Sequence, residues 1–116
     1  MFSIKTYDAG VDDGYLGVTL VFDYQGFKIE LTPEYQEKIL KINIDAESGK
    51  FETSPNNGCF SFSWTPSLIS FYVDRCGDGQ GGSIHINFPS TSEMLDSLHQ
   101  ALHQWKEICQ ENESEN

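Results

Sequence analysis

Two histidines in a predicted C-terminal helix are the residues of this chain best suited to hold a metal ion. His99 and His103 lie four residues apart, with Asp96 and Glu107 extending the row, and His85 is the third histidine of the chain. Residues four apart on an α-helix share one face, so two imidazoles at this spacing can bind the same ion. The row borders the apolar stripe of the helix, and no Glu follows the first His as in helical zinc proteases. We therefore expect no cofactor and keep His99 and His103 as the candidate metal ligands.

The glycine-rich run at residues 77–82 has the composition of a phosphate-binding loop but not its context. Such a loop joins a strand to a helix and ends in Lys followed by Ser or Thr. Here the run connects two predicted strands, no lysine lies nearby, and Asp78 would repel phosphate. One carboxylate is also too few for a calcium loop. The run is predicted to be a hairpin loop.

The cysteines bear on the cellular compartment rather than on catalysis. Cys59, Cys76 and Cys109 are odd in number, widely spaced and without a CxxC pair, which favours a reducing compartment over a disulfide framework. Arg75 would favour the thiolate of Cys76, but no nucleophile signature surrounds it. The first ten residues lack a secretory signal and no stretch is long enough to span a membrane, so we expect a cytoplasmic protein.

Carboxylates in predicted turns and at strand ends, together with several tyrosines, form the candidate partner-binding set. Tyrosines supply anchors at protein interfaces, and surrounding acids select a basic partner. The alternative interpretation is that turns are simply polar and that strand aromatics belong to the core. The set comprises Asp12, Asp13, Tyr15, Tyr24, Asp45, Glu47, Glu52, Tyr72, Asp74 and Asp78.

Strands must position most of these residues, because apolar side chains alternate with polar ones along much of the chain. The firmest prediction is a hairpin in which Tyr15–Tyr24 and Phe27–Leu31 are joined at Gln25-Gly26, where glycine tolerates a positive φ. Leu68–Asp74 is more continuously apolar and is predicted to be a central strand covered on both faces. Further strands are predicted at residues 2–7, 60–64 and 84–88.

Residues 32–54 are ambiguous between helix and strand. Thr32-Pro33-Glu34 has the composition of a helix start, whereas Leu40, Ile42 and Ile44 alternate with polar residues as in a strand. We predict one short helix near residues 33–38, a strand near 39–45, a turn at 46–49 and a strand at 50–54.

The clearest element is a helix over residues 89–110. Ser90 and Glu93 have the spacing of a capping box, and apolar residues recur every three or four positions from Met94 to Cys109. Residues 111–116 contain no apolar side chain and are predicted to be an acidic, flexible tail. The fold class is α+β: one mainly antiparallel sheet of about six to eight strands packed against the C-terminal helix, in a single domain over residues 1–110.

Charge is the property that bears most on function. The chain of 116 residues has a formal net charge of −11, while 38% apolar and 13% aromatic residues suffice for a core. Nucleic acids and anionic membranes are disfavoured partners, because binding phosphate requires Lys and Arg. A basic protein is the favoured partner, although the charge could equally serve solubility alone.

The sequence contains no motif that assigns a function, so the hypothesis rests on size and charge. We expect a non-catalytic, acidic inhibitor that binds a basic, nucleic-acid-handling protein. It could be an immunity protein against a nuclease toxin, or a phage-encoded anti-CRISPR inhibitor that imitates DNA and blocks a nucleic-acid-guided defence complex. One alternative is a small metal-binding domain or enzyme that uses His99 and His103. Another is a structural subunit of a larger assembly, in which an unpaired sheet edge would permit a homodimer.

Overall fold

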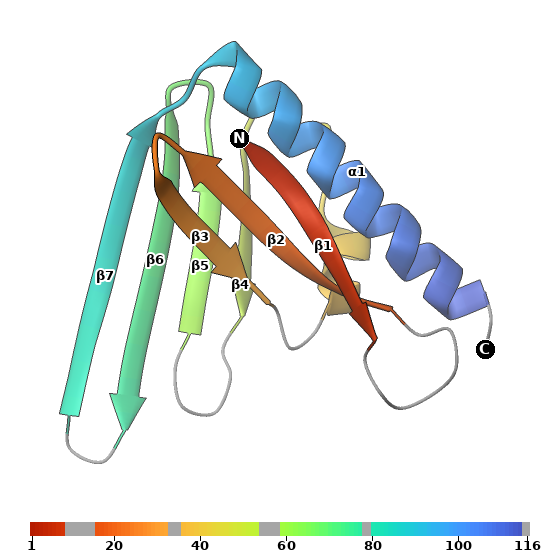
Figure 1. Cartoon of the computed structure of the whole chain (residues 1–116), viewed down its shortest axis with the longest axis horizontal. Helices are drawn as coiled ribbons and strands as arrows, with labels where there is room; N and C mark the ends of the chain where they lie inside the picture. The colour runs from red at the N-terminus through yellow and green to blue at the C-terminus, as the bar shows by residue number, and fades with distance from the viewer. Residues whose placement is uncertain (9–15, 33–35, 54–58, 78–79, 115–116) are drawn as a thin grey trace.

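The computed structural model describes residues 1–8, 16–32, 36–53, 59–77 and 80–114. It is an α+β structure with two antiparallel sheets, one short 3₁₀ helix and one long α-helix (Figure 1). In chain order the elements are β1 (Phe2–Asp8), β2 (Leu16–Tyr24), β3 (Phe27–Leu31), η1 (Gln36–Lys41), β4 (Gly49–Thr53), β5 (Cys59–Trp64), β6 (Leu68–Gly77), β7 (Gln80–Pro89) and α1 (Ser92–Ser114).

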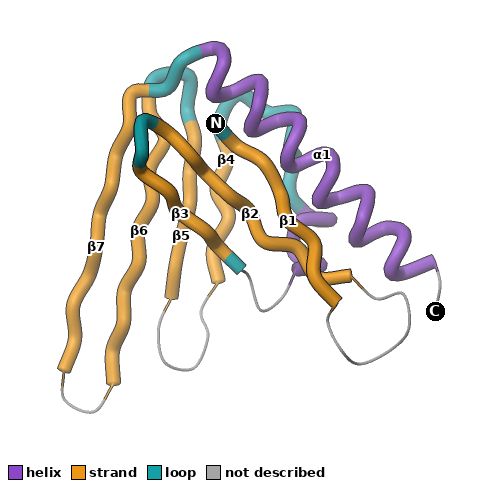
Figure 2. Tube along the Cα trace, viewed as in Figure 1, coloured by secondary structure: helices purple, strands orange, loops and turns teal. Residues whose placement is uncertain are grey.

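The strands form two sheets, not the single sheet that we predicted. β1, β2 and β3 make a three-stranded sheet, and β4 to β7 make a four-stranded sheet, each with neighbouring strands in chain order. Helix α1 lies alongside β1, on the side away from β3 (Figure 2). The three-stranded sheet and α1 thus together cover one face of the four-stranded sheet. Alternation along a strand is a local signal and does not reveal which hairpins share a sheet.

The β2–β3 hairpin has the predicted turn. Tyr24 pairs with Phe27, and the two turn residues Gln25 and Gly26 have φ angles of 50° and 83°. Two consecutive positive φ angles are the geometry of a type I′ turn, whose twist matches that of the strands it joins. Val18, Leu20 and Phe22 face the core from β2, as their spacing predicts.

Between β3 and β4 we predict a short helix followed by a strand, and the predicted strand is wrong. The short helix is a 3₁₀ helix and lies three residues later than expected, at Gln36–Lys41, and no strand is described at 39–45. Ile39 and Ile44 are buried, whereas Leu40 and Ile42 are only half-buried. The NH of Ile42 donates to the carbonyl of Ile39. The segment is held by two buried isoleucines five residues apart, a spacing that fits neither a sheet face nor a long helix.

Helix α1 begins later and ends later than predicted. Thr91 is the N-cap in place of Ser90, because its Oγ1 accepts the NH of Met94 at 3.1 Å. Ser90 instead donates through Oγ to the carbonyl of Thr65. The helix continues through residues 111–114, which we had assigned to a tail. None of the described helices has the length and apolarity needed to cross a membrane.

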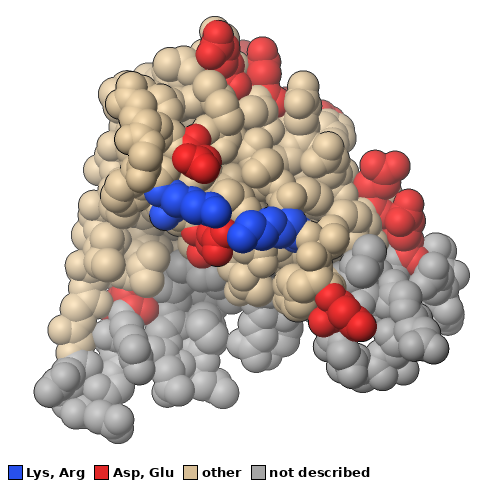
Figure 3. Space-filling model, in the orientation of Figure 1, with Lys and Arg blue, Asp and Glu red and all other residues tan. Residues whose placement is uncertain are grey.

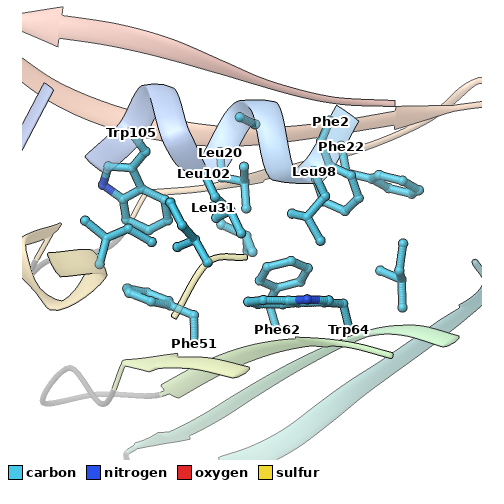
Figure 4. Close-up of a cluster of buried hydrophobic side chains, with 14 of the residues drawn as sticks. Phe2, Leu20, Phe22, Leu31, Phe51, Phe62, Trp64, Leu98, Leu102 and Trp105 are labelled. Carbon is cyan, nitrogen blue, oxygen red and sulfur yellow. The ribbon is translucent and has the colours of Figure 1, made fainter. Parts of the chain in front are cut away.

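Aromatic side chains dominate the core between the two layers (Figure 4). Phe62 and Trp64 project from β5 toward Phe2 and α1, and Trp105 of α1 packs on Phe51 with ring centroids 5.0 Å apart. Most of the predicted apolar stripe of α1 is buried, although its members Leu95 and Ile108 are only half-buried. The members that are at most 4% exposed are Met94, Leu98, Ala101, Leu102, Trp105 and Cys109. Ser97 links α1 to β1, since its Oγ accepts the NH of Phe2 at 3.0 Å.

Strand β6 is central in its sheet, but it is not covered on both faces as we predicted. Ile69 and Phe71 are buried on its inner face, whereas Leu68 is 40% exposed on the outer one. β6 and β7 also extend to Gly77 and Gln80, so most of the predicted loop at residues 76–82 is strand. The glycines favoured a loop prediction, because glycine weakens the interior of a strand.

Candidate functional site

The outer face of the four-stranded sheet is the candidate functional site, and we call it the polar face. Strand alternation creates it, because the same strands direct their aromatic residues to the core on the other side. Helix α1 and the three-stranded sheet both lie on that inner side (Figure 1). The described side chains of the polar face are Lys50, Glu52, Ser61, Ser63, Ser70, Tyr72, Asp74, Ser83, His85 and Asn87, with Leu68 and Pro89 at one end.

Strand register aligns these side chains in rows across the sheet. Glu52 pairs with Ser61, Ser61 with Tyr72, and Tyr72 with His85, so four strands contribute to one row. Tyr72 and His85 are in contact, with ring centroids 4.4 Å apart and planes inclined at 55°. Asp74 stands two residues beyond Tyr72 on the same face. Tyr72 thus shares this face with two carboxylates: Asp74 on its own strand, and Glu52 on β4, from which Ser61 separates it.

The polar face offers hydrogen-bonding groups on a surface that is neither strongly charged nor apolar. On this face Lys50 Nζ lies 2.6 Å from Glu52 Oε1 in an ion pair, and both side chains are more than half exposed. Tyr72 is half-buried by its neighbours, and His85 is exposed. Hydroxyl, phenol, imidazole and amide groups can match many partner geometries, which suits recognition of a macromolecular surface.

Three of the ten residues predicted to bind a partner meet on this face, namely Glu52, Tyr72 and Asp74. Four others, Asp12, Asp13, Tyr15 and Asp78, lie outside the described residues. The remaining three, Tyr24, Asp45 and Glu47, are placed elsewhere by the structure. The set therefore does not form one patch among the residues that the structure describes.

Tyr24 belongs to the packing between the two sheets. Its ring centroid lies 6.1 Å from that of Phe22 and 5.9 Å from that of Phe88 on the opposite sheet. The side chain is half-buried and packs against the core. The alternative interpretation, that strand aromatics are core residues, therefore holds for this tyrosine.

Asp45 lies in the segment between η1 and β4, beside the C-terminal half of α1. Its Oδ1 is 2.6 Å from Nε2 of His103, and both side chains are more than half exposed. The two residues border a depression of about 350 Å³ that Ile44, Lys106, Glu107 and Gln110 complete. Glu47 is exposed in the same segment. The contact fastens the segment to the helix, and its exposure limits its contribution to stability.

The histidine pair of α1 does not form a metal site with the described residues. His103 is engaged by Asp45, while His99 is half-buried and its Nε2 is enclosed without a hydrogen-bond partner among them. His85 cannot join the pair, because it lies on the polar face, with the sheet between it and α1. No group of three or more His, Cys, Asp or Glu side chains suited to a metal ion occurs within the described ranges.

Of the cysteines, only Cys109 has a described side chain, and it is buried as predicted. The side chains of Cys59 and Cys76 lie outside the description, as does that of Arg75. The proposed influence of Arg75 on the Cys76 thiol thus concerns side chains that the structure does not place.

The positive charges of the described chain are partly neutralised on the outer face of the three-stranded sheet. Glu30 bonds to Lys5 and lies 3.5 Å from Lys28. The hydrogen bond from Lys5, opposed by slight desolvation, lowers the pKa of the Glu30 carboxyl. In Figure 3 basic and acidic side chains lie next to one another near the centre of the view, and further acidic side chains lie toward its edges. The surplus of negative charge is spread over several surfaces.

Sequence reasoning missed most of the polar face, although a signal for it was present. Ser61 and Ser63 alternate with aromatic residues on one strand, and Ser83, His85 and Asn87 alternate with apolar residues on another. Taken singly, each set marks only the solvent side of a strand. Pairing with β6 joins the two sets into one surface, and that long-range pairing is absent from the local pattern.

Comparisons with known proteins give no family for the chain. No protein-family model matches it, and neither the curated proteins nor the solved structures contain a significant match.

Proposed function

We propose that this protein is a non-catalytic binding protein that docks its polar face on the basic surface of a nucleic-acid-handling protein. The target would be a nuclease toxin or a nucleic-acid-guided defence complex. Bound there, the protein would occupy the surface that the nucleic acid needs and would exclude it sterically and electrostatically. This role requires no reaction at the site, only complementarity and charge.

The observation that carries the proposal is that Tyr72 lies with Glu52 and Asp74 on one sheet face, opposite the core. A tyrosine supplies a large, amphipathic contact at a small cost in conformational entropy. The carboxylates of Glu52 and Asp74 would meet Lys or Arg of the target. The surrounding serines can donate or accept hydrogen bonds and so adapt to the partner.

The net charge supports the same proposal at longer range. A chain with a net charge of −11 attracts a positively charged surface before contact and speeds the encounter. Attraction of this kind weakens as salt is added. We therefore expect fast, salt-sensitive association, with the Tyr72 region determining how long the complex lasts.

The geometry favours recognition over catalysis. Catalytic and small-ligand sites are usually concave, with a few polar groups converging on one point. The side chains of the polar face instead project in parallel from neighbouring strands. The one described depression contains His103, whose Nε2 is already engaged by Asp45.

Capture from a native host lysate tests the proposal with two matched variants. Glu52→Lys with Asp74→Lys alters the polar face, and Glu93→Lys with Asp96→Lys makes the same change in net charge on exposed positions of α1. We expect wild type and the α1 variant to enrich the same basic, nucleic-acid-handling protein, and the polar-face variant to lose it. Thermal unfolding of each variant establishes that the fold is intact.

The captured protein then provides a direct functional readout. Once purified, its binding to nucleic acid should be blocked by equimolar wild-type chain and restored by the polar-face substitutions. If both variants lose the target equally, net charge and not the polar face is responsible. If no basic or nucleic-acid-handling protein is enriched by the wild type, the proposal fails.

A further inference from the structure

Strand β7 is an edge strand of the four-stranded sheet, and its length and sequence differ from those of the other edge strands. It is ten residues long and pairs, within the described chain, with β6 alone. Its sequence, QGGSIHINFP, contains no Lys, Arg, Asp or Glu. Natural edge strands are normally kept short or charged, because their exposed NH and carbonyl groups can pair with another chain.

The other three border strands carry these protections. β3 and β4 have five residues each, and each contains one lysine and one glutamate. β1 has seven residues, contains Lys5 and lies beside α1. The absence of protection is therefore specific to β7 and does not reflect the chain as a whole.

The inner face near the β7 edge also exposes aliphatic side chains. Ile84 of β7 is 57% exposed, and Val73, its direct partner on β6, is 38% exposed. Both point to the side on which the core lies, but β6 and β7 extend beyond the end of β3 and leave this end uncovered (Figure 1). Ile86 and Phe88 continue the same row toward the core and are half-buried.

We infer that β7 pairs antiparallel with β7 of a second copy of this chain, which joins the two four-stranded sheets into one sheet of eight strands. A two-fold axis perpendicular to the sheet relates the copies, so each face continues into its equivalent. Only registers that pair even-numbered residues with even-numbered ones satisfy this symmetry. If Ile84 faces Ile86 of the second copy, Ser83 faces Asn87; if Ile84 faces Phe88, His85 faces Asn87.

The distribution of charge favours a second copy of the chain over other partners at the β7 edge. Two chains of net charge −11 repel each other over most of their surfaces, and an uncharged strand is where they can approach most closely. A basic partner, in contrast, would find no carboxylate along this strand. Burial of Ile84 and Val73 adds an apolar contribution to the main-chain hydrogen bonds.

The first test is the concentration dependence of the mass in solution. Sedimentation equilibrium of the full chain should show a reversible transition from 13.1 kDa to twice that mass. Raising the salt concentration from about 0.05 M to about 0.5 M should strengthen the dimer, because it screens the repulsion between the copies. Target binding through acids should respond to salt in the opposite direction, which separates this inference from the proposed function.

Ile84→Lys tests the location of the interface. It places a charge on the edge strand at an exposed position, and it also reduces the net negative charge, which would favour any non-specific association. We expect the dimer dissociation constant to rise at least about tenfold. Tyr7→Lys, at a 40% exposed position on β1, is the matched control and should leave the constant unchanged.

Hydrogen exchange identifies the paired strand independently of mutation. At concentrations that favour the dimer, amides of β7 should gain protection while those of the edge strands β3 and β4 do not. A wild-type chain that stays monomeric at millimolar concentration overturns the inference. So does a dimer that survives Ile84→Lys, or one that protects β3 or β4 instead of β7.

Discussion

Alternate residues of the same strands make the two faces of the four-stranded sheet, yet the two faces are under different physical constraints. On the inner face Phe51, Phe62 and Phe71 pair directly across three strands and are buried to 3% exposure or less. One residue along, the outer face aligns Glu52, Ser61 and Tyr72. The inner row is constrained by the shape of the core, whereas the role proposed for the outer row is to bind a partner. Stability should therefore depend on one face and recognition on the other.

The largest expected effect comes from removing an aromatic side chain from the inner face. Phe62→Ala should reduce the free energy of unfolding by about 3–5 kcal/mol, because it leaves a cavity among Phe2, Trp64 and Phe71. Its neighbour Ser61 points outward, and Ser61→Ala should change that free energy by less than about 0.5 kcal/mol. Urea denaturation measures both. Similar losses in the two variants would contradict the division between the faces.

Two glycines that lie beneath aromatic rings sharpen the comparison at an intermediate magnitude. A Cβ at Gly49 would overlap the indole of Trp64, and one at Gly17 would overlap the ring of Tyr7. Trp64 is 1% exposed and cannot move aside, whereas Tyr7 is 40% exposed and can. Gly49→Ala should therefore cost about 1–3 kcal/mol and Gly17→Ala less than about 1 kcal/mol. Thermal unfolding should separate the two variants clearly.

A smaller effect is expected for the Tyr72–His85 contact on the polar face. Cross-strand pairs of this kind contribute about 0.2–1 kcal/mol. A double-mutant cycle with Tyr72→Ala and His85→Ala should give a coupling in that range. A much larger coupling would mean that the polar face stabilises the fold as well as offering a binding surface.

The smallest effect concerns Glu30, on the outer face of the other sheet. The pKa of its carboxyl lies below the ordinary value of 4.5, chiefly through the hydrogen bond from Lys5. A lowered pKa stabilises the folded state above the unfolded-state value, and that stabilisation is lost as the pH falls through the lowered pKa. Lys5→Ala should therefore lower the melting temperature slightly at pH 7 and not at all in strong acid. Added salt should also diminish the difference.

Local signals were sufficient for the elements that use local chemistry. Gln25-Gly26 predicted the β2–β3 turn, and the apolar spacing from Met94 to Cys109 predicted the buried side of α1. Where two signals competed, as at residues 32–45, tertiary packing of Ile39 and Ile44 decided the outcome. The predicted N-cap was wrong by one residue, because Ser90 and Thr91 are both residue types that cap helices. The hydroxyl of Ser90 bonds to the carbonyl of Thr65, and that of Thr91 caps the helix.

The candidate site was less predictable, since it depends on which strands become neighbours. Glu52, Tyr72 and Asp74 come from three positions whose proximity follows from the register of β4, β5 and β6. Tyr24 has a similar alternating context, yet it packs between the sheets against Phe88. Residue type and alternation do not distinguish these two tyrosines. The division of the strands into two sheets distinguishes Tyr24 from Tyr72.

The two tryptophans give this fold a pair of built-in optical probes. Trp64 and Trp105 are each 1% exposed, but they occupy different boundaries of the core. Trp64 donates through Nε1 to the carbonyl of Ala46 at 3.2 Å, whereas Trp105 packs from the helix against Phe51 with the ring planes inclined at 59°. Trp64→Phe and Trp105→Phe would each leave one emitter. Fluorescence of the two variants would then reveal whether α1 and the four-stranded sheet come apart together or in sequence during unfolding.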